Sequence, residues 1–164
     1  MAEFEWEIVR AFNTFFEEEG IEAIAYRLRQ ARFSAQHMDV LVDSRYPEYY
    51  LAIECKSLAT ESPLYFKQHF SPDQIERESR FIELSGRTGV LAVEFRGGKG
   101  RSKSAHLIPW SVLKEIRDSG ASCLSIETVE SYPEIPRSMG CYRLSHRIIS
   151  EVYNACRYRY GNRI

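Results

Sequence analysis

The sequence has few cysteines, no long hydrophobic run and almost no net charge. No apolar stretch approaches the roughly eighteen residues that a membrane-crossing helix needs, and the N-terminus is acidic and amphipathic rather than signal-like. We therefore expect a cytoplasmic protein with no membrane partner. The four cysteines lie far apart, without CxxC pairs or histidines at ligand spacing, so neither a zinc site nor a disulfide framework is expected. They are Cys55, Cys123, Cys141 and Cys156.

A net charge of −1 argues against strong nucleic-acid binding, because phosphate-binding proteins usually carry a basic surplus. The basic residues are nevertheless clustered, and a neutral total can contain a basic face. Ordinary solvated charge explains each cluster equally well. The clusters are Arg27, Arg29 and Arg32; Arg96, Lys99, Arg101 and Lys103; and Arg157, Arg159 and Arg163.

The chain does have enough apolar material for a core. Its 164 residues, 44% hydrophobic and 13% aromatic, suit a single domain over 1–164. Periodicity, turn residues and capping residues predict the elements in order. These are helix 2–19, strands 21–28, 37–44 and 49–58, helix 71–85, strand 88–95, loop 96–103, strand 105–108, helix 109–118, strand 123–128 and helix 144–158. This order predicts an α/β fold with a mixed central β-sheet flanked by helices.

One group of residues has the character of a catalytic site. Residues two apart in a strand point to the same face, so Glu54 and Lys56 project together. Asp39 begins the preceding strand of the predicted hairpin, within cross-strand reach of Glu54. Two carboxylates suit Mg²⁺, which polarises a phosphate and acidifies a bound water, and a lysine can orient that water. A surface ladder of salt bridges is the structural alternative.

Asp39 and Glu54-Cys55-Lys56, preceded by a helix bearing glutamates, resemble the PD-(D/E)XK nuclease superfamily. Within it, residues 2–115 are most similar to archaeal-type Holliday junction resolvases, although Met38 stands where the proline of the motif name would be. The resemblance implies a restriction-endonuclease-like core followed by a C-terminal extension over 116–164. It also implies a Mg²⁺-dependent endonuclease for branched DNA, with Mn²⁺ able to substitute, acting as a homodimer.

Two other functions remain open from the residues. One is a repair or restriction nuclease acting on other DNA, since loops and dimer geometry rather than the core set the substrate. The other is a module that binds DNA or protein on the same fold without catalysis.

The resemblance implies a further acidic ligand on the first helix. Glu5 lies at the end of the apolar stripe that contains Val9 and Phe12, so we choose it over Glu7. Simple charge at a helix N-terminus explains either residue as well. Gln74 completes a capping box after Ser71, and that role is favoured over support of the active site.

Several polar residues are candidates for contacting DNA. The glycine-rich loop 96–103 could hold the DNA backbone, although a solvated hairpin would look the same. Ser34 occupies the place of a resolvase serine, and a plain loop hydroxyl is favoured for it. His37 is expected to be structural. The predicted DNA-binding residues are Arg32, Ser34, Arg96, Lys99, Arg101 and Lys103.

Overall fold

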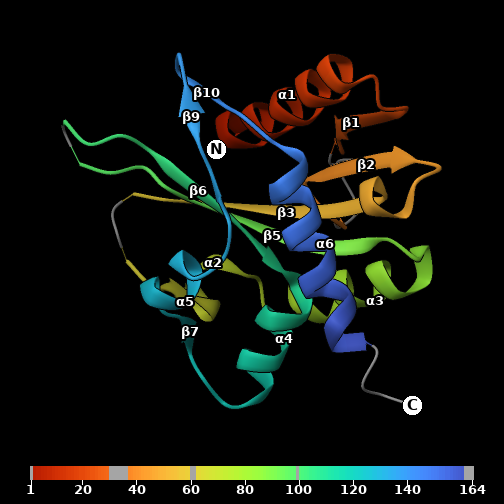
Figure 1. Ribbon diagram of the computed structural model, residues 1–164. Coiled ribbons are helices and arrows are strands. Elements are labelled where there is room, and N and C mark those ends of the chain that lie inside the picture. Colours follow the sequence, from red (N-terminus) through yellow and green to blue (C-terminus); the bar gives the residue numbers. More distant parts are fainter. Residues whose placement is uncertain (1, 30–36, 60–61, 99, 161–164) are drawn as a thin grey trace.

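The computed structural model describes residues 2–29, 37–59, 62–98 and 100–160. At its centre is a six-stranded sheet in the order β1-β2-β3-β5-β6-β8. Only β3 and β5 pair in parallel, and the other neighbours are antiparallel. The strands are β1 (Ala23–Arg27), β2 (Val40–Ser44), β3 (Leu51–Leu58), β5 (Thr88–Phe95), β6 (Ser104–Pro109) and β8 (Glu134–Ile135). The predicted mixed α/β sheet flanked by helices is therefore confirmed (Figure 1).

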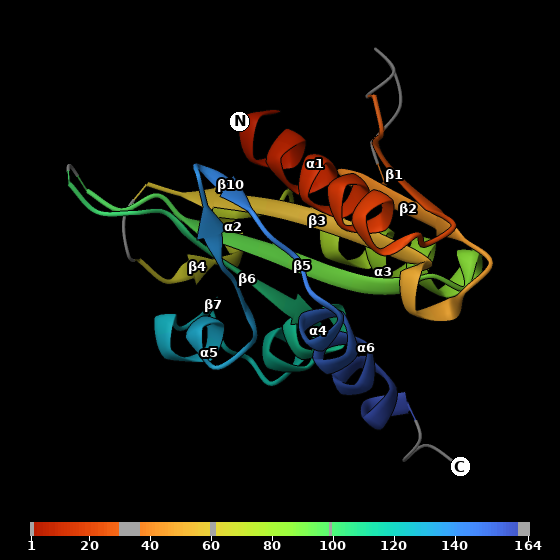
Figure 2. The same ribbon diagram turned by 45° about the horizontal axis from the view of Figure 1, so that its top comes forward.

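One face of the sheet is covered by α1 (Ala2–Glu19) and α6 (His146–Tyr160). The apolar stripe of α1 is buried, with Ile8 and Phe12 fully enclosed, because it packs on the sheet as the helical spacing predicts. Figure 2 shows α1 lying across β1, β2 and β3.

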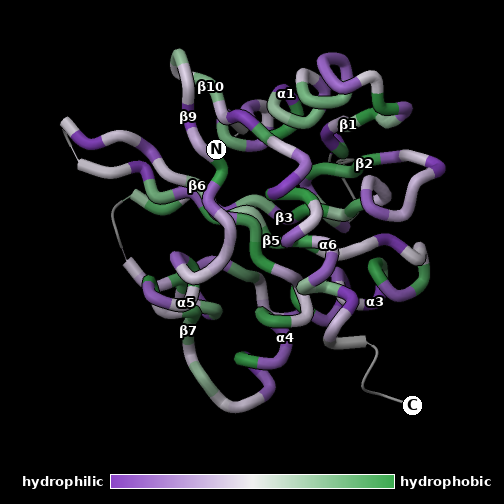
Figure 3. Tube along the Cα trace, viewed as in Figure 1, coloured by the Kyte–Doolittle hydropathy of each residue, from purple (hydrophilic) through white to green (hydrophobic). Residues whose placement is uncertain are grey.

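The other face carries a second core formed with α3 (Gln74–Ser85), α4 (Trp110–Asp118) and α5 (Ile126–Glu130). Because both faces are covered, β5 is buried from Gly89 to Phe95, and its middle is continuously apolar rather than alternating, as Figure 3 shows for the central strands. Gly89 lets α3 and α4 approach β5. An added Cβ there would lie 2.5 Å from Ile82 Cδ1 and 2.8 Å from Trp110 Cβ.

The predicted hairpin of residues 37–44 and 49–58 forms as β2 and β3, with the short helix η1 (Pro47–Tyr49) in the turn. The predicted helix at Pro109 begins one residue later, because Pro109 is the last residue of β6. Small elements complete the described chain. They are β4 (Leu64–Tyr65), α2 (Phe66–His69), β7 (Cys123–Leu124), β9 (Arg137–Ser138) and β10 (Cys141–Tyr142).

The predicted strand over 123–128 is wrong after its first two residues. Ser125 is the N-cap of α5, and its hydroxyl accepts a hydrogen bond from the Thr128 amide at 3.1 Å. A short apolar run does not distinguish a strand from a capped helical turn, and here the cap decides. In the described part of the chain, no helix is both long and apolar enough to cross a membrane.

Candidate active site

Glu54 and Lys56 lie on β3 and point to the face that α3 covers. Their neighbours Ile53 and Cys55 point to the opposite face, into the core beneath α1. The Lys56 ammonium donates to Glu54 Oε1 at 2.7 Å and lies 4.6 Å from the centre of the Phe70 ring. Glu54 is almost completely buried, so this ion pair is part of the interior and not a surface ladder.

Asp39 lies immediately before β2, opposite Glu54. Pairing of Val40 with Ile53 sets this register, and the Asp39 amide donates to the Ile53 carbonyl at 3.1 Å. The Asp39 carboxylate accepts a hydrogen bond from the Cys55 amide at 2.8 Å, which fixes its direction. The structure therefore brings Asp39, Glu54 and Lys56 together.

The Glu54 carboxylate is buried, and that of Asp39 beside it is partly buried. Burial, and then the charge of Glu54, raise the pKa of Asp39 to about 7. The described residues contain no group of three or more acidic, histidine or cysteine side chains arranged to hold a metal ion. A divalent cation at this place would be held by Asp39 and Glu54, and Mg²⁺ binds well to two carboxylates with waters or phosphate oxygens. The site has two carboxyl groups and a single ammonium, that of Lys56, and this composition favours binding of such a cation.

Glu5 comes from the first turn of α1 and forms an ion pair with Arg27 of β1. Burial, and then the charge of Asp39, raise the pKa of Glu5 despite the nearby guanidinium. Glu5 therefore lies near enough to Asp39 for the two carboxylates to repel each other. Glu7 points elsewhere and binds Arg137 at 3.1 Å. Residues two positions apart in an α-helix lie about 200° apart around its axis, so Glu5 and Glu7 face different sides of α1.

Gln74, the first residue of α3, connects that helix to the site. Its Nε2 donates to Glu54 Oε1 at 2.8 Å and to Glu78 Oε1 at 2.9 Å. Its Oε1 accepts from the Ser71 amide at 3.1 Å, which is half of the predicted capping box. Ser71 itself is not the cap: Asp73 occupies that position and makes no capping hydrogen bond. The capping box favoured from the sequence therefore does not form, and Gln74 contacts Glu54 of the site instead.

Glu78 is the site residue that sequence reasoning missed. It is 1% exposed and lies one turn after Gln74 on the side of α3 that faces the sheet. Its spacing in the sequence could have indicated this position. Glu78 lies four residues before the apolar Ile82, and residues at that spacing share one face of a helix. Burial, and then the charge of Glu54, raise the pKa of Glu78 to about 9. At neutral pH the Glu78 carboxyl therefore favours its protonated form.

The raised pKa values predict how stability depends on pH in metal-free protein. The folded state holds protons on Asp39 and Glu78 that the unfolded chain releases near pH 4, so the free energy of unfolding falls as pH rises. The Asp39 part of this loss ends near pH 7. Between pH 7 and 9 only Glu78 of the two still titrates. We expect the wild type to lose about 2 kcal/mol over that interval.

Glu78→Gln should abolish most of that loss, because glutamine keeps the shape without a titrating proton. Urea unfolding at pH 7, 8 and 9 measures the change. The control is Glu83→Gln on the same helix, where the carboxylate is 71% exposed. Equal slopes for wild type and Glu78→Gln would show that Glu78 is already ionised at pH 7.

The predicted DNA-binding residues lie in several different places. Arg32, Ser34 and Lys99 lie outside the described residues. Arg96 and Arg101 are exposed at the start and end of the loop between β5 and β6. His37 is exposed and stacks on Phe81 with ring centres 4.9 Å apart.

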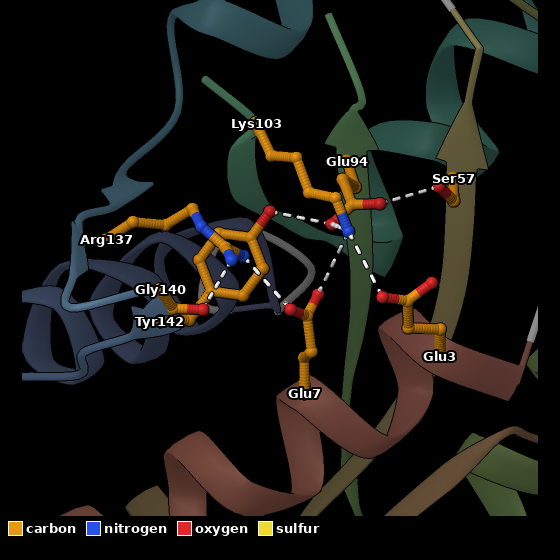
Figure 4. A network of polar contacts seen from close by, with 8 residues as sticks. All are labelled: Glu3, Glu7, Ser57, Glu94, Lys103, Arg137, Gly140 and Tyr142. Atoms are coloured by element: carbon orange, nitrogen blue, oxygen red, sulfur yellow. Dashed lines mark hydrogen bonds and ion pairs between the residues drawn. The ribbon is translucent and has the colours of Figure 1, made fainter.

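Lys103 lies on the far side of α1 from the active site. Its ammonium is surrounded by three carboxylates, with Glu3 at 3.6 Å, Glu7 at 3.8 Å and Glu94 at 4.0 Å (Figure 4). This gives Lys103 a structural role, and its contact with DNA stays a prediction.

No protein-family model matches the chain, and no curated protein matches it. Among solved structures, the chain is similar to that of Hjc, a Holliday junction resolvase from the archaeal hyperthermophile Archaeoglobus fulgidus. The match covers 90% of this chain and 98% of that chain, with 17% sequence identity and a TM-score of 0.43.

Proposed function

We propose that the protein is a metal-dependent DNA endonuclease that hydrolyses phosphodiester bonds in branched DNA. The observation that carries the proposal is the buried group of Asp39, Glu54 and Lys56. Two facing carboxylates with a single neighbouring ammonium form a site that favours a divalent cation, and that cation would neutralise a phosphate.

Mg²⁺ held by Asp39 and Glu54 would polarise the scissile phosphate and lower the pKa of a bound water. The chain's own groups supply position and proton control. Gln74 and Lys56 both donate to Glu54 Oε1 and fix that carboxylate, while the Cys55 amide fixes Asp39. The Lys56 ammonium can orient the attacking water and stabilise charge on the phosphate oxygens in the transition state.

Glu5 would act with Arg27. Their ion pair places a carboxylate near Asp39 and a guanidinium beside it. Glu5 could hold a second water of the metal shell, and Arg27 could bind a phosphate oxygen as a fixed cation.

The choice of branched DNA and of a two-fold dimer follows from the resemblance of residues 2–115 to archaeal-type resolvases. A dimer would present two such sites to the paired strands of a four-way junction. Light scattering of the free protein tests the dimer independently of activity.

Cleavage of labelled DNA tests the proposal. We expect cutting with Mg²⁺ or Mn²⁺, none with EDTA, and faster cutting of a four-way junction than of linear duplex. Flap and single-stranded DNA in the same panel test the other nuclease functions. Binding without cutting of any substrate at any metal concentration would contradict the enzyme and favour a non-catalytic DNA-binding module.

A further inference from the structure

The hairpin formed by β9 and β10 carries an exposed methionine at its tip. Met139 is 95% exposed, and its backbone is left-handed with φ +52°, followed by Gly140 at φ +78°. Two-residue hairpin turns with both φ values positive normally contain Asn-Gly or Asp-Gly, because other side chains are strained there. Methionine at this position is therefore unfavourable twice, through its backbone and through its exposed apolar surface.

The hairpin is held rigidly despite being short. The Tyr142 hydroxyl donates to Glu94 at 2.7 Å, and Glu94 also accepts from the Ser57 hydroxyl at 2.7 Å. The Arg137 guanidinium lies 4.5 Å from the centre of the Tyr142 ring and donates to the Gly140 carbonyl. Figure 4 shows these contacts converging at the base of the hairpin. These contacts attach the hairpin to β3 and β5 and leave Met139 at its tip.

The same contacts attach the hairpin to the elements that carry the candidate active site. Arg137 binds Glu7, two residues after Glu5 on α1, and Ser57 is the residue after Lys56 on β3. Figures 1 and 2 both place the hairpin beside the start of α1. In Figure 1 it projects from the same end of the sheet as the loop between β5 and β6.

The acids near the hairpin do not leave this surface strongly negative. Glu7 is paired with Arg137 and Lys103, and Glu18 lies 3.5 Å from Arg143 of the chain that follows β10. The exposed Arg96 and Arg101 stand on the neighbouring loop. Each carboxylate beside the hairpin therefore has a cation next to it, with Lys103 shared among Glu3, Glu7 and Glu94.

We propose that Met139 is an apolar wedge that inserts between adjacent bases of the DNA substrate and opens the stack. The inference rests on the proposed nuclease function. One methionine offers too little area to dock a protein, since a specific interface takes about 800 Å² from each partner. Opening one base step needs only a single apolar side chain, and methionine is among those that proteins use for it.

The test combines binding with a fluorescent base. A four-way junction with 2-aminopurine at the branch point brightens when that base unstacks, and EDTA in the buffer removes any dependence on cleavage. We expect wild type and Met139→Leu to brighten the probe. Met139→Asn should bind the junction at least 10-fold more weakly and leave the probe dark.

The melting temperature is a second readout, and here Met139→Asn is expected to cause no loss. Asparagine accepts the left-handed backbone better than methionine, so Met139→Asn should melt at the same temperature as wild type or higher. Leu84→Gln, which removes a 69% exposed side chain at the end of α3, is the control and should change neither binding nor brightening.

Junction binding and brightening by Met139→Asn equal to wild type would overturn the wedge, even if the protein cuts DNA. Absence of junction binding by the wild type would overturn it as well. Brightening that depends on Met139 in a protein that cuts no DNA would support the wedge while contradicting the nuclease.

Discussion

Lys56→Met should lower the rate of DNA cleavage by about 10²–10⁴-fold, with little change in DNA binding. The reason is that the Lys56 ammonium lies 2.7 Å from Glu54, inside the site, where it can act on the attacking water and on the phosphate. Single-turnover cleavage at saturating Mg²⁺ measures the chemical step. Lys114→Met, on the exposed side of α4, is the matched control and should cut like wild type.

Asp39→Asn should lose cleavage to a similar extent, because a neutral amide holds a divalent cation poorly. The variant also separates loss of chemistry from loss of folding. Removing a charge that faces Glu54 should keep or raise the free energy of unfolding of metal-free protein at pH 8. Cleavage by Asp39→Asn within 10-fold of wild type would place the catalytic centre elsewhere on the molecule.

Arg87→Met should destabilise the protein by about 3 kcal/mol, the largest effect on folding that we expect from one side chain outside the core. Its guanidinium is 9% exposed and donates to the Val42 carbonyl at 2.9 Å, the Leu51 carbonyl at 3.3 Å and Asp43 at 2.6 Å. It also lies 4.3 Å from the centre of the Tyr50 ring. Removing it takes a donor from two strand carbonyls and leaves Asp43 with the Tyr26 hydroxyl as its remaining donor.

Urea unfolding measures this effect, and Arg80→Met provides the control. Arg80 pairs with Glu83 on the surface of α3, where both side chains are more than 60% exposed, so its loss should cost less than about 0.5 kcal/mol. Equal stability of the two variants would mean that desolvation of the Arg87 guanidinium already offsets its contacts.

The sequence by itself determined the parts of the molecule that depend on near neighbours in the chain. Helical spacing of apolar residues predicts α1, and a short turn between two β-rich runs predicts the hairpin of β2 and β3. The convergence of Asp39, Glu54 and Lys56 follows from that hairpin, because strand alternation and register are local properties. Where local signals are weak, as at 123–128, the prediction was wrong.

Only the tertiary structure decided what surrounds that group. Glu78 and Gln74 reach Glu54 because α3 packs closely over β5, an approach that the absence of a side chain at Gly89 permits. The raised pKa of Asp39 likewise depends on its burial in the folded chain and on the charge of Glu54. The network around Glu94 joins residues 37 and 48 positions away. Local spacing sets the direction of a side chain within its own element, whereas contact between elements depends on how their apolar faces pack together.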